Sequence, residues 1–364
     1  MWSPETTTKR KKPSPTPQSI TNPSLPDELI LSCLARVSRL YYPILSLVSK
    51  SFGSLLVSQE LYKVRYGQTE SCLYVCLQFY PSKNPSWFTL CRKPDQTLTN
   101  DTNKLKKSLS KKEKKKKARG YVLVSVPILH SPPAHSLSLV AVGSNIYDIG
   151  GSIYPKISSS VWTLDCWSHT WRQAPSLRRS FQVFDTLTQT WDPESIPCIK
   201  IDGKFYSQSA CIDGKIHVVT DKEVVTYNSK DGRWHRPWRG VTKLSDSGSY
   251  CEIENVLYAY FNGGLRWLDT KVGLWRNLNG LVGLPKFAFA ALVRLADYGG
   301  KMIVLWAKNL PCVLFGESKK MIWCAEIKLI KRKNNEIWGK VMWCDHVLTV
   351  PITYEFVKVL AATV

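Results

Sequence analysis

The sequence has no apolar run close to the roughly 18 residues that a membrane-spanning helix requires. Its first residues, MWSPETTTKRKK, lack the apolar stretch of a secretory signal peptide. The 11 cysteines are scattered and include no CxxC pair, so they favour neither a zinc site nor a disulfide framework. These absences predict a soluble intracellular protein, in the cytoplasm or nucleus, with reduced thiols and no membrane contact.

Motifs for catalysis and cofactor binding are also absent. The six histidines show no HExxH or other metal-ligand spacing, and no phosphate-binding GxxxxGK[ST] loop occurs. No pairing of cysteine with histidine suggests a nucleophile and its base. We therefore expect neither an enzyme nor a bound metal or cofactor.

Acidic residues are scarce, since 28 Asp and Glu stand against 50 Lys and Arg and give a net charge of +22. Two runs hold 13 of these charges: +4 at residues 9–12 and +9 at residues 104–119. Both runs lack aromatic residues that could stack on bases, so specific nucleic-acid binding is not favoured. Their composition predicts a disordered basic tail at residues 1–20 and a disordered Lys-rich loop at about 95–119, compatible with nuclear import.

Residues 24–62 carry helix signals. Ser24, Pro26 and Asp27 combine a polar cap, a proline and an acidic residue, all of which favour a helix start. A second helix is predicted between Pro43 and Gly53, and a third short segment follows it. Three helices in about 40 residues give a domain near the lower size limit of independent stability. Exposed apolar residues on such a domain indicate a binding partner.

This segment closely resembles the F-box of plant F-box/kelch-repeat proteins, through Leu25-Pro26-Asp27-Glu28 and through residues 45–52, LSLVSKSF. The resemblance implies binding to a Skp-type linker subunit and, through it, to a cullin of a ubiquitin ligase. The positions that it assigns to linker binding are Leu25, Pro26, Asp27, Ile30, Leu34, Leu45, Val48 and Phe52. From spacing alone, packing of the helices against one another explains the apolar positions equally well.

From residue 136 onward the chain repeats itself. Each unit has a short strand that ends in Asp or Asn, followed six residues later by Trp. Glycine-containing turns precede these strands, and together the signals predict four-stranded units. The landmarks are Gly150, Gly151, Asp165, Trp171, Asp185, Trp191, Trp234, Asp269 and Trp275. A weaker fifth copy runs from Gly299-Gly300 to Trp323.

These landmarks resemble kelch repeats, which implies an all-β propeller after the small all-α domain. Trp191 to Trp234 spans 43 residues, but Trp171 to Trp191 spans only 20, whereas a kelch unit has roughly 50. The short interval contains the outer half of a repeat. We therefore expect an irregular propeller whose second blade lacks its inner strand pair. This propeller has either a two-stranded partial blade at residues 181–195 or a ring of fewer, rearranged blades.

Three apolar runs precede the repeats, at residues 72–79, 87–90 and 121–126. We expect them to complete the blade that begins near the C-terminus. The predicted domains are a tail (1–20), an F-box domain (21–66), strands joining the propeller (67–130), the propeller (131–350) and a C-terminal strand or tail (351–364).

The resemblance implies a non-catalytic substrate-recognition adaptor of a Skp-cullin-F-box ubiquitin ligase, whose propeller binds an unknown protein for degradation. Two alternatives stay open. One is a kelch scaffold that does not engage a ligase, and the other is a basic nuclear factor that binds nucleic acid through its Lys-rich run. Trp238, in a loop beside two arginines, is a candidate recognition residue.

Overall fold

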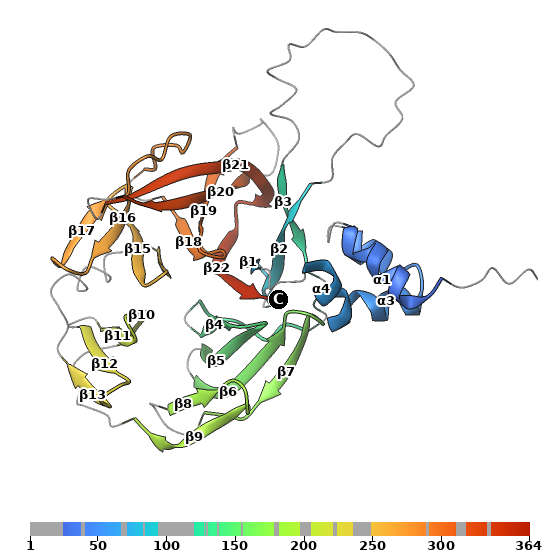
Figure 1. Cartoon of the computed structure of the whole chain (residues 1–364), viewed down its shortest axis with the longest axis horizontal. Helices are drawn as coiled ribbons and strands as arrows, with labels where there is room; N and C mark the ends of the chain where they lie inside the picture. Colours follow the sequence, from blue (N-terminus) through green and yellow to red (C-terminus); the bar gives the residue numbers. More distant parts are fainter. Residues whose placement is uncertain are drawn as a thin grey trace, which may run out of the picture.

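The computed structural model describes residues 25–37, 41–66, 71–82, 84–93, 120–126, 128, 130–136, 138–153, 156–177, 182–196, 205–220, 224–235, 249–288, 291–310, 318–332 and 336–364. Short helices near the N-terminus lie outside a ring of small β-sheets (Figure 1). The predicted tail at 1–20, the Lys-rich loop and Trp238 lie outside the described residues. A small all-α domain followed by a β-propeller is the predicted fold class, and it is confirmed.

The helical block comprises α1 (Asp27–Arg36), α2 (Tyr42–Leu45), α3 (Lys50–Leu56) and α4 (Gln59–Tyr66). The prediction of three helices was wrong, because the second predicted helix is divided. Ser49 is extended, with φ −159°, and its hydroxyl accepts a hydrogen bond from the Phe52 amide at 3.1 Å. This N-cap starts a new helix. Gly53 lies inside α3 and does not end the preceding helix.

Among the described residues, five sheets of four strands and one sheet of two strands follow the order of the chain around the ring. Blade 1 contains β4 (Leu139–Val142), β5 (Asn145–Ile153), β6 (Lys156–Asp165) and β7 (Thr170–Ala174). Blade 2 contains β8 (Gln182–Asp185) and β9 (Thr190–Ser195). Blade 3 contains β10 (Phe205–Ile212), β11 (Lys215–Thr220), β12 (Val224–Asn228) and β13 (Arg233–His235).

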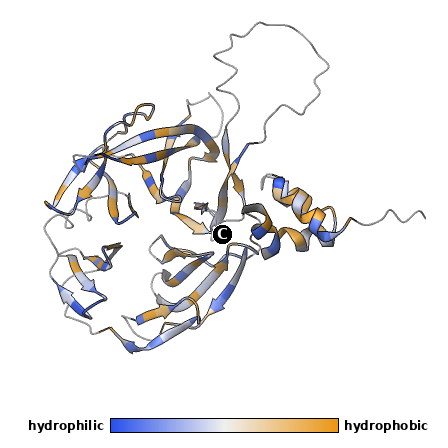
Figure 2. Ribbon diagram, viewed as in Figure 1, coloured by the Kyte–Doolittle hydropathy of each residue, from blue (hydrophilic) through white to orange (hydrophobic). Residues whose placement is uncertain are grey.

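Blade 4 contains β14 (Ser249–Ile253), β15 (Val256–Phe261), β16 (Gly264–Asp269) and β17 (Leu274–Asn277). Blade 5 contains β18 (Val293–Asp297), β19 (Met302–Asn309), β20 (Lys319–Lys331) and β21 (Ile337–Pro351). Blade 6 contains β22 (Tyr354–Thr363), β1 (Ser71–Phe79), β2 (Ser86–Arg92) and β3 (Tyr121–Ser125). Figure 2 shows hydrophobic residues in β18 and β22, which are the innermost strands of blades 5 and 6.

The repeated Asp or Asn closes one kind of turn in blades 1 to 4. Asp165, Asp185, Asn228 and Asp269 each end the third strand of a full blade, or the first of the half blade, and accept a hydrogen bond from the amide two residues later. Four residues after each of them the backbone has positive φ, at His169, Gln189, Gly232 and Gly273. The Asp or Asn side chain therefore stabilises a turn that reverses the chain within a few residues.

The repeated Trp is the second residue of the outer strand in each of these blades. Trp171 pairs across the sheet with Leu164, and its ring lies 5.9 Å from the ring of Trp87 in blade 6. The Trp191 indole donates to the carbonyl of Pro175, which follows blade 1, at 2.7 Å. These two Trp therefore fill space between neighbouring blades, as the sequence predicts.

Blade 2 has the predicted truncation. Its sheet contains β8 and β9, and no further strand pairs with them among the residues that the structure describes. The Phe184 ring lies 5.7 Å from the Tyr147 ring of blade 1, and the Gln189 side chain donates to the Tyr147 hydroxyl at 2.8 Å. The half blade is therefore held against β5, the second strand of blade 1.

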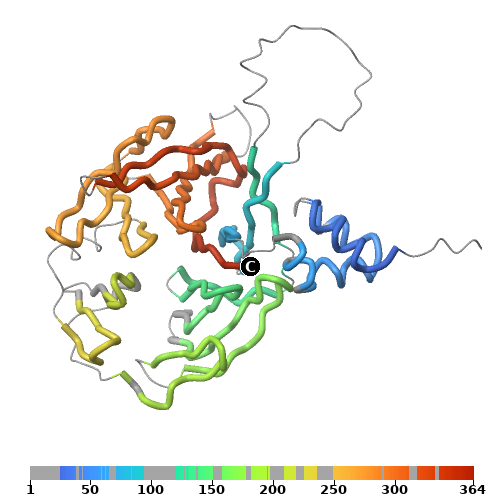
Figure 3. The backbone as a smooth tube through the Cα atoms, viewed as in Figure 1, coloured from blue at the N-terminus to red at the C-terminus, as the bar shows by residue number. Residues whose placement is uncertain are grey.

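The two ends of the propeller chain close the ring, as predicted. β22 pairs antiparallel with β1, from Ser71 opposite Thr363 to Phe79 opposite Tyr354. Figure 3 shows this C-terminal red strand beside the cyan and green residues of β1 to β3. Tyr121 of β3 also stacks on Trp343 of blade 5, with ring centres 4.0 Å apart. Blade 6 therefore joins strands from both ends of the sequence.

Three residues of the repeat units occupy other places than the repeat predicts. Gly150 and Gly151 lie inside β5, at a register shift opposite β6, and not in a turn. Gly150 has φ +63°, and a β-carbon there would lie 3.0 Å from the Ser158 carbonyl oxygen, so this bulge requires glycine. Trp323 lies within β20, the third strand of blade 5, and does not open a fourth strand.

Candidate functional site

The helical block has a small core of its own. Leu31, Leu34, Leu56 and Leu61 are buried in it. Ile30, Leu45 and Phe52, three of the residues predicted to bind a linker, pack against this core and are half-buried. Leu34, a fourth such residue, is only 4% exposed. The structure thus places Leu34 inside the block, where a partner could not contact it without rearrangement.

The other predicted linker residues lie on the surface. Leu25, Pro26, Asp27 and Val48 are all exposed. Six further large apolar residues of the helical block that sequence reasoning did not select are exposed as well: Leu29, Tyr41, Ile44, Leu47, Val57 and Val64. Leu47, in the turn after α2, is 84% exposed. Leu29 stands four residues before Cys33, which is also exposed, within α1, and this helical spacing is the signal that could have found it.

An exposed apolar surface on so small a domain favours association. We name Leu25, Leu29, Ile44, Leu47 and Val48 the docking residues. Fully burying a Leu, Ile or Val side chain contributes roughly 1.5–3 kcal/mol. Five such side chains can therefore drive binding to an apolar partner surface, while Leu31, Leu34, Leu56 and Leu61 hold the helices together.

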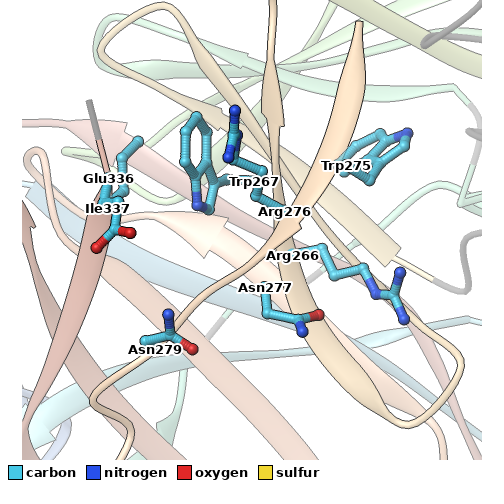
Figure 4. Close-up of a pocket in the computed structure, with 8 residues that line it drawn as sticks. All are labelled: Arg266, Trp267, Trp275, Arg276, Asn277, Asn279, Glu336 and Ile337. Carbon is cyan, nitrogen blue, oxygen red and sulfur yellow. The ribbon is translucent and has the colours of Figure 1, made fainter. Parts of the chain in front are cut away.

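The propeller carries a cavity of about 390 Å³ at the outer strands of blade 4. Figure 4 shows its lining residues Arg266, Trp267, Trp275, Arg276, Asn277, Asn279, Glu336 and Ile337. Arg276 is paired with Asp269 at 2.7 Å, and the guanidinium carbon of Arg266 lies 4.7 Å from the centre of the Phe261 ring. The two guanidinium groups point in different directions in Figure 4. They therefore do not converge on one anion.

Two cations lie on inner strands of neighbouring blades, Arg294 on β18 and Lys358 on β22. Burial lowers the pKa of the Arg294 guanidinium. Burial, and then repulsion from Arg294, lowers the pKa of the Lys358 ammonium. The two cations therefore lie near each other on the inner strands of blades 5 and 6, and the carboxylate of Glu355 lies near Arg294.

Within the described ranges, no three His, Cys, Asp or Glu side chains come together in a group that could hold a metal ion. None of the described helices has the length and apolar character needed to cross a membrane.

Comparison with known families matches both parts of the chain. The F-box domain model matches residues 23–64, which include α1 to α3 and most of α4. The model described as FKB95, Kelch-repeats domain, matches residues 87–181 and 178–348. A helical F-box followed by a kelch propeller defines a class of substrate-recognition adaptors that are generally non-catalytic. The chain belongs to the F-box/kelch-repeat protein family.

Relatives in Arabidopsis thaliana match nearly the whole chain. The F-box/kelch-repeat protein At5g51250 is 54% identical over 376 residues, which cover 93% of this chain and 99% of the relative. The F-box/kelch-repeat protein At4g39550 is 50% identical over 402 residues, which cover 100% of both chains. The F-box is thus associated with a kelch propeller throughout these plant relatives.

The comparisons also bear on the truncated blade. The two parts of the kelch match meet at residues 178–181, immediately before β8. The alignment with At4g39550 extends over 402 residues, whereas this chain has 364. That relative therefore carries residues that this chain lacks. The two kelch matches overlap next to blade 2, whose described residues form β8 and β9 alone.

Proposed function

We propose that this chain is the substrate-recognition subunit of a Skp-cullin-F-box ubiquitin ligase. Its F-box binds a Skp-type linker subunit, which in turn binds a cullin, and its propeller binds the protein to be ubiquitinated. Ubiquitin transfer takes place on other subunits. The observation that carries the proposal is the set of exposed docking residues on a helical block that already has its own buried core.

The position of the two parts supports this division of labour. The helical block lies outside the ring in Figure 1, so a linker bound to it leaves much of the propeller accessible. Loops on a rigid propeller are suited to protein recognition, because their sequences vary while the scaffold is retained.

The experiment is a binding assay between the full chain and a Skp-type subunit. Replacing Leu25 and Pro26 together with Ala removes apolar contact and the geometry at the start of α1. We expect binding to weaken by several kcal/mol if both side chains are buried at the interface. Leu47→Asp should weaken binding as well, because it places a charge at one of the exposed docking residues.

Val272→Asp is the matched control, because Val272 is also exposed but lies in the turn between β16 and β17. It should leave linker binding unchanged. The melting temperature of each variant separates lost contact from unfolding. Full retention of binding by both docking variants would remove the proposal.

A further inference from the structure

The truncated blade leaves the facing surfaces of blades 1 and 3 uncovered. In each full blade with a two-residue first turn, the last residue of the first strand pairs with the first residue of the second strand. Val142, Ile212 and Ile253 are these residues in blades 1, 3 and 4. Ile212 is 3% exposed and Ile253 is 1% exposed, because the next blade covers them, but Val142 is 42% exposed. Val140, on the same face of β4, is exposed to the same extent.

The facing surface of blade 3 shows the same difference. Ile146, Ile216 and Leu257 are each the second residue of the second strand, in blades 1, 3 and 4. Ile146 and Leu257 are 0% exposed, whereas Ile216 is 38% exposed. Cys211, directly opposite Ile216 in the sheet, is exposed too. Two apolar walls therefore face the position from which an inner strand pair is missing.

The half blade between these walls offers an open strand edge. The strand that corresponds to β8 in a full blade is the third one. These third strands are paired on both edges in blades 1, 3, 4 and 5, where they are β6, β12, β16 and β20. β8 pairs with β9 on one edge and has no partner strand on the other among the described residues. Val183 of β8 is exposed as well. Backbone groups on an unpaired edge favour the addition of an extended strand.

We propose that this gap binds an extended, apolar segment of the captured protein, which adds to the edge of β8 and replaces the missing inner strands. A strand fits because its successive side chains point to opposite faces, one toward Val140 and Val142 and the next toward Ile216. A helix would leave the edge of β8 unpaired, because its own backbone groups are already bonded. This inference rests on the proposed function for the identity of the partner, but the gap itself follows from the fold.

The test uses the full chain and a synthetic peptide with the sequence of residues 139–149, which forms the inner hairpin β4–β5 of blade 1. A scrambled peptide of the same composition is its control. Binding is measured from labelled peptide, and also from the rate at which a maleimide modifies Cys211. Cys33, exposed in the helical block, is the internal control for labelling.

We expect the hairpin peptide to slow modification of Cys211 by about tenfold and to leave that of Cys33 unchanged, as burial of one thiol predicts. Val142→Asp and Ile216→Asp should each weaken peptide binding by about tenfold, because either carboxylate would lose its water in the filled gap. Both residues are exposed, so the folded chain tolerates the change. Val272→Asp should bind the peptide normally.

Equal labelling of Cys211 with hairpin and scrambled peptides would overturn the proposal. So would a concentration-dependent dimer that Val142→Asp abolishes while the peptide does not bind, because a second copy would then be the occupant. The double Leu25→Ala, Pro26→Ala variant should keep peptide binding while it loses the linker. Failure of the gap and failure of the F-box are therefore distinguished on the same protein.

Discussion

At the scale of single residues, glycines with positive φ have two different reasons to be glycine. Gly143 and Gly150 have φ +56° and +63°, so a side chain strains the backbone at either position. At Gly143 the added β-carbon would meet nothing within 4 Å, whereas at Gly150 it would lie 3.0 Å from the Ser158 carbonyl oxygen. A side chain at Gly143 would therefore cause backbone strain alone, whereas a side chain at Gly150 would cause backbone strain and steric crowding.

Gly143→Ala and Gly150→Ala should both destabilise the propeller. The backbone term costs about 1–2 kcal/mol at each position, and the bulge at Gly150 adds the cost of moving Ser158. The free energy of unfolding, from urea titration of each variant, measures the difference. If Gly143→Ala is the more damaging of the two, the bulge in β5 has been assigned the wrong role.

At the scale of elements, closure of the ring depends mainly on one strand, β22. β22 contributes Phe356 and Val359 to the core shared by blades 5 and 6, and Val357 and Ala362 to the core shared by blades 6 and 1. Its backbone also pairs with the whole of β1. The ring is therefore closed by the last residues of the chain.

Deleting residues 354–364 should abolish the cooperatively folded propeller. Loss of Phe356, Val357 and Val359 alone removes burial of roughly 1.5–3 kcal/mol per side chain, which together approaches the 5–15 kcal/mol by which a native domain is stable. Circular dichroism melting and limited proteolysis measure the effect. Deletion of residues 1–20, the predicted tail, is the control and should leave the melting temperature unchanged. An intact melting transition after removal of β22 would contradict closure by this strand.

At the scale of the whole molecule, positive charge and stability are carried by different parts of the chain. The Lys-rich run lies between β2 and β3, whose ends are already joined: Arg92 pairs with Tyr121, and the Lys93 amide bonds to the Gly120 carbonyl at 2.8 Å. The two strands are therefore joined by their own backbone hydrogen bonds.

Deleting residues 104–117 should leave the melting temperature nearly unchanged, since closure entropy grows slowly with loop length and the run supplies no core. The run is also a predicted nuclear-import signal, so a fluorescent fusion of the deletion variant should accumulate less in the nucleus. A variant with the lysines of this run changed to Gln, at full length, is the control for charge. A large fall in melting temperature would show that the segment is ordered.

Local patterns and counting along the chain determined much of this protein. The Leu-Pro-Asp start predicted a helical F-box, and the interval of 20 residues between Trp171 and Trp191 predicted a half blade. The apolar runs before the repeats predicted ring closure, because strands with no partner in their own unit must pair elsewhere. These features depend on spacing, which the sequence states directly.

Only the tertiary structure decided which apolar side chains face solvent. Leu29 and Ile30 are neighbours in one helical stripe, yet Leu29 is exposed and Ile30 packs on the core, because the direction of each side chain depends on how four helices meet. Val142 and Ile253 occupy equivalent strand ends, and Val142 is uncovered because the described part of the next blade contains no inner strand pair. Burial is a property of neighbours that are distant in sequence, so the apolar walls beside the half blade became visible only when the ring was assembled.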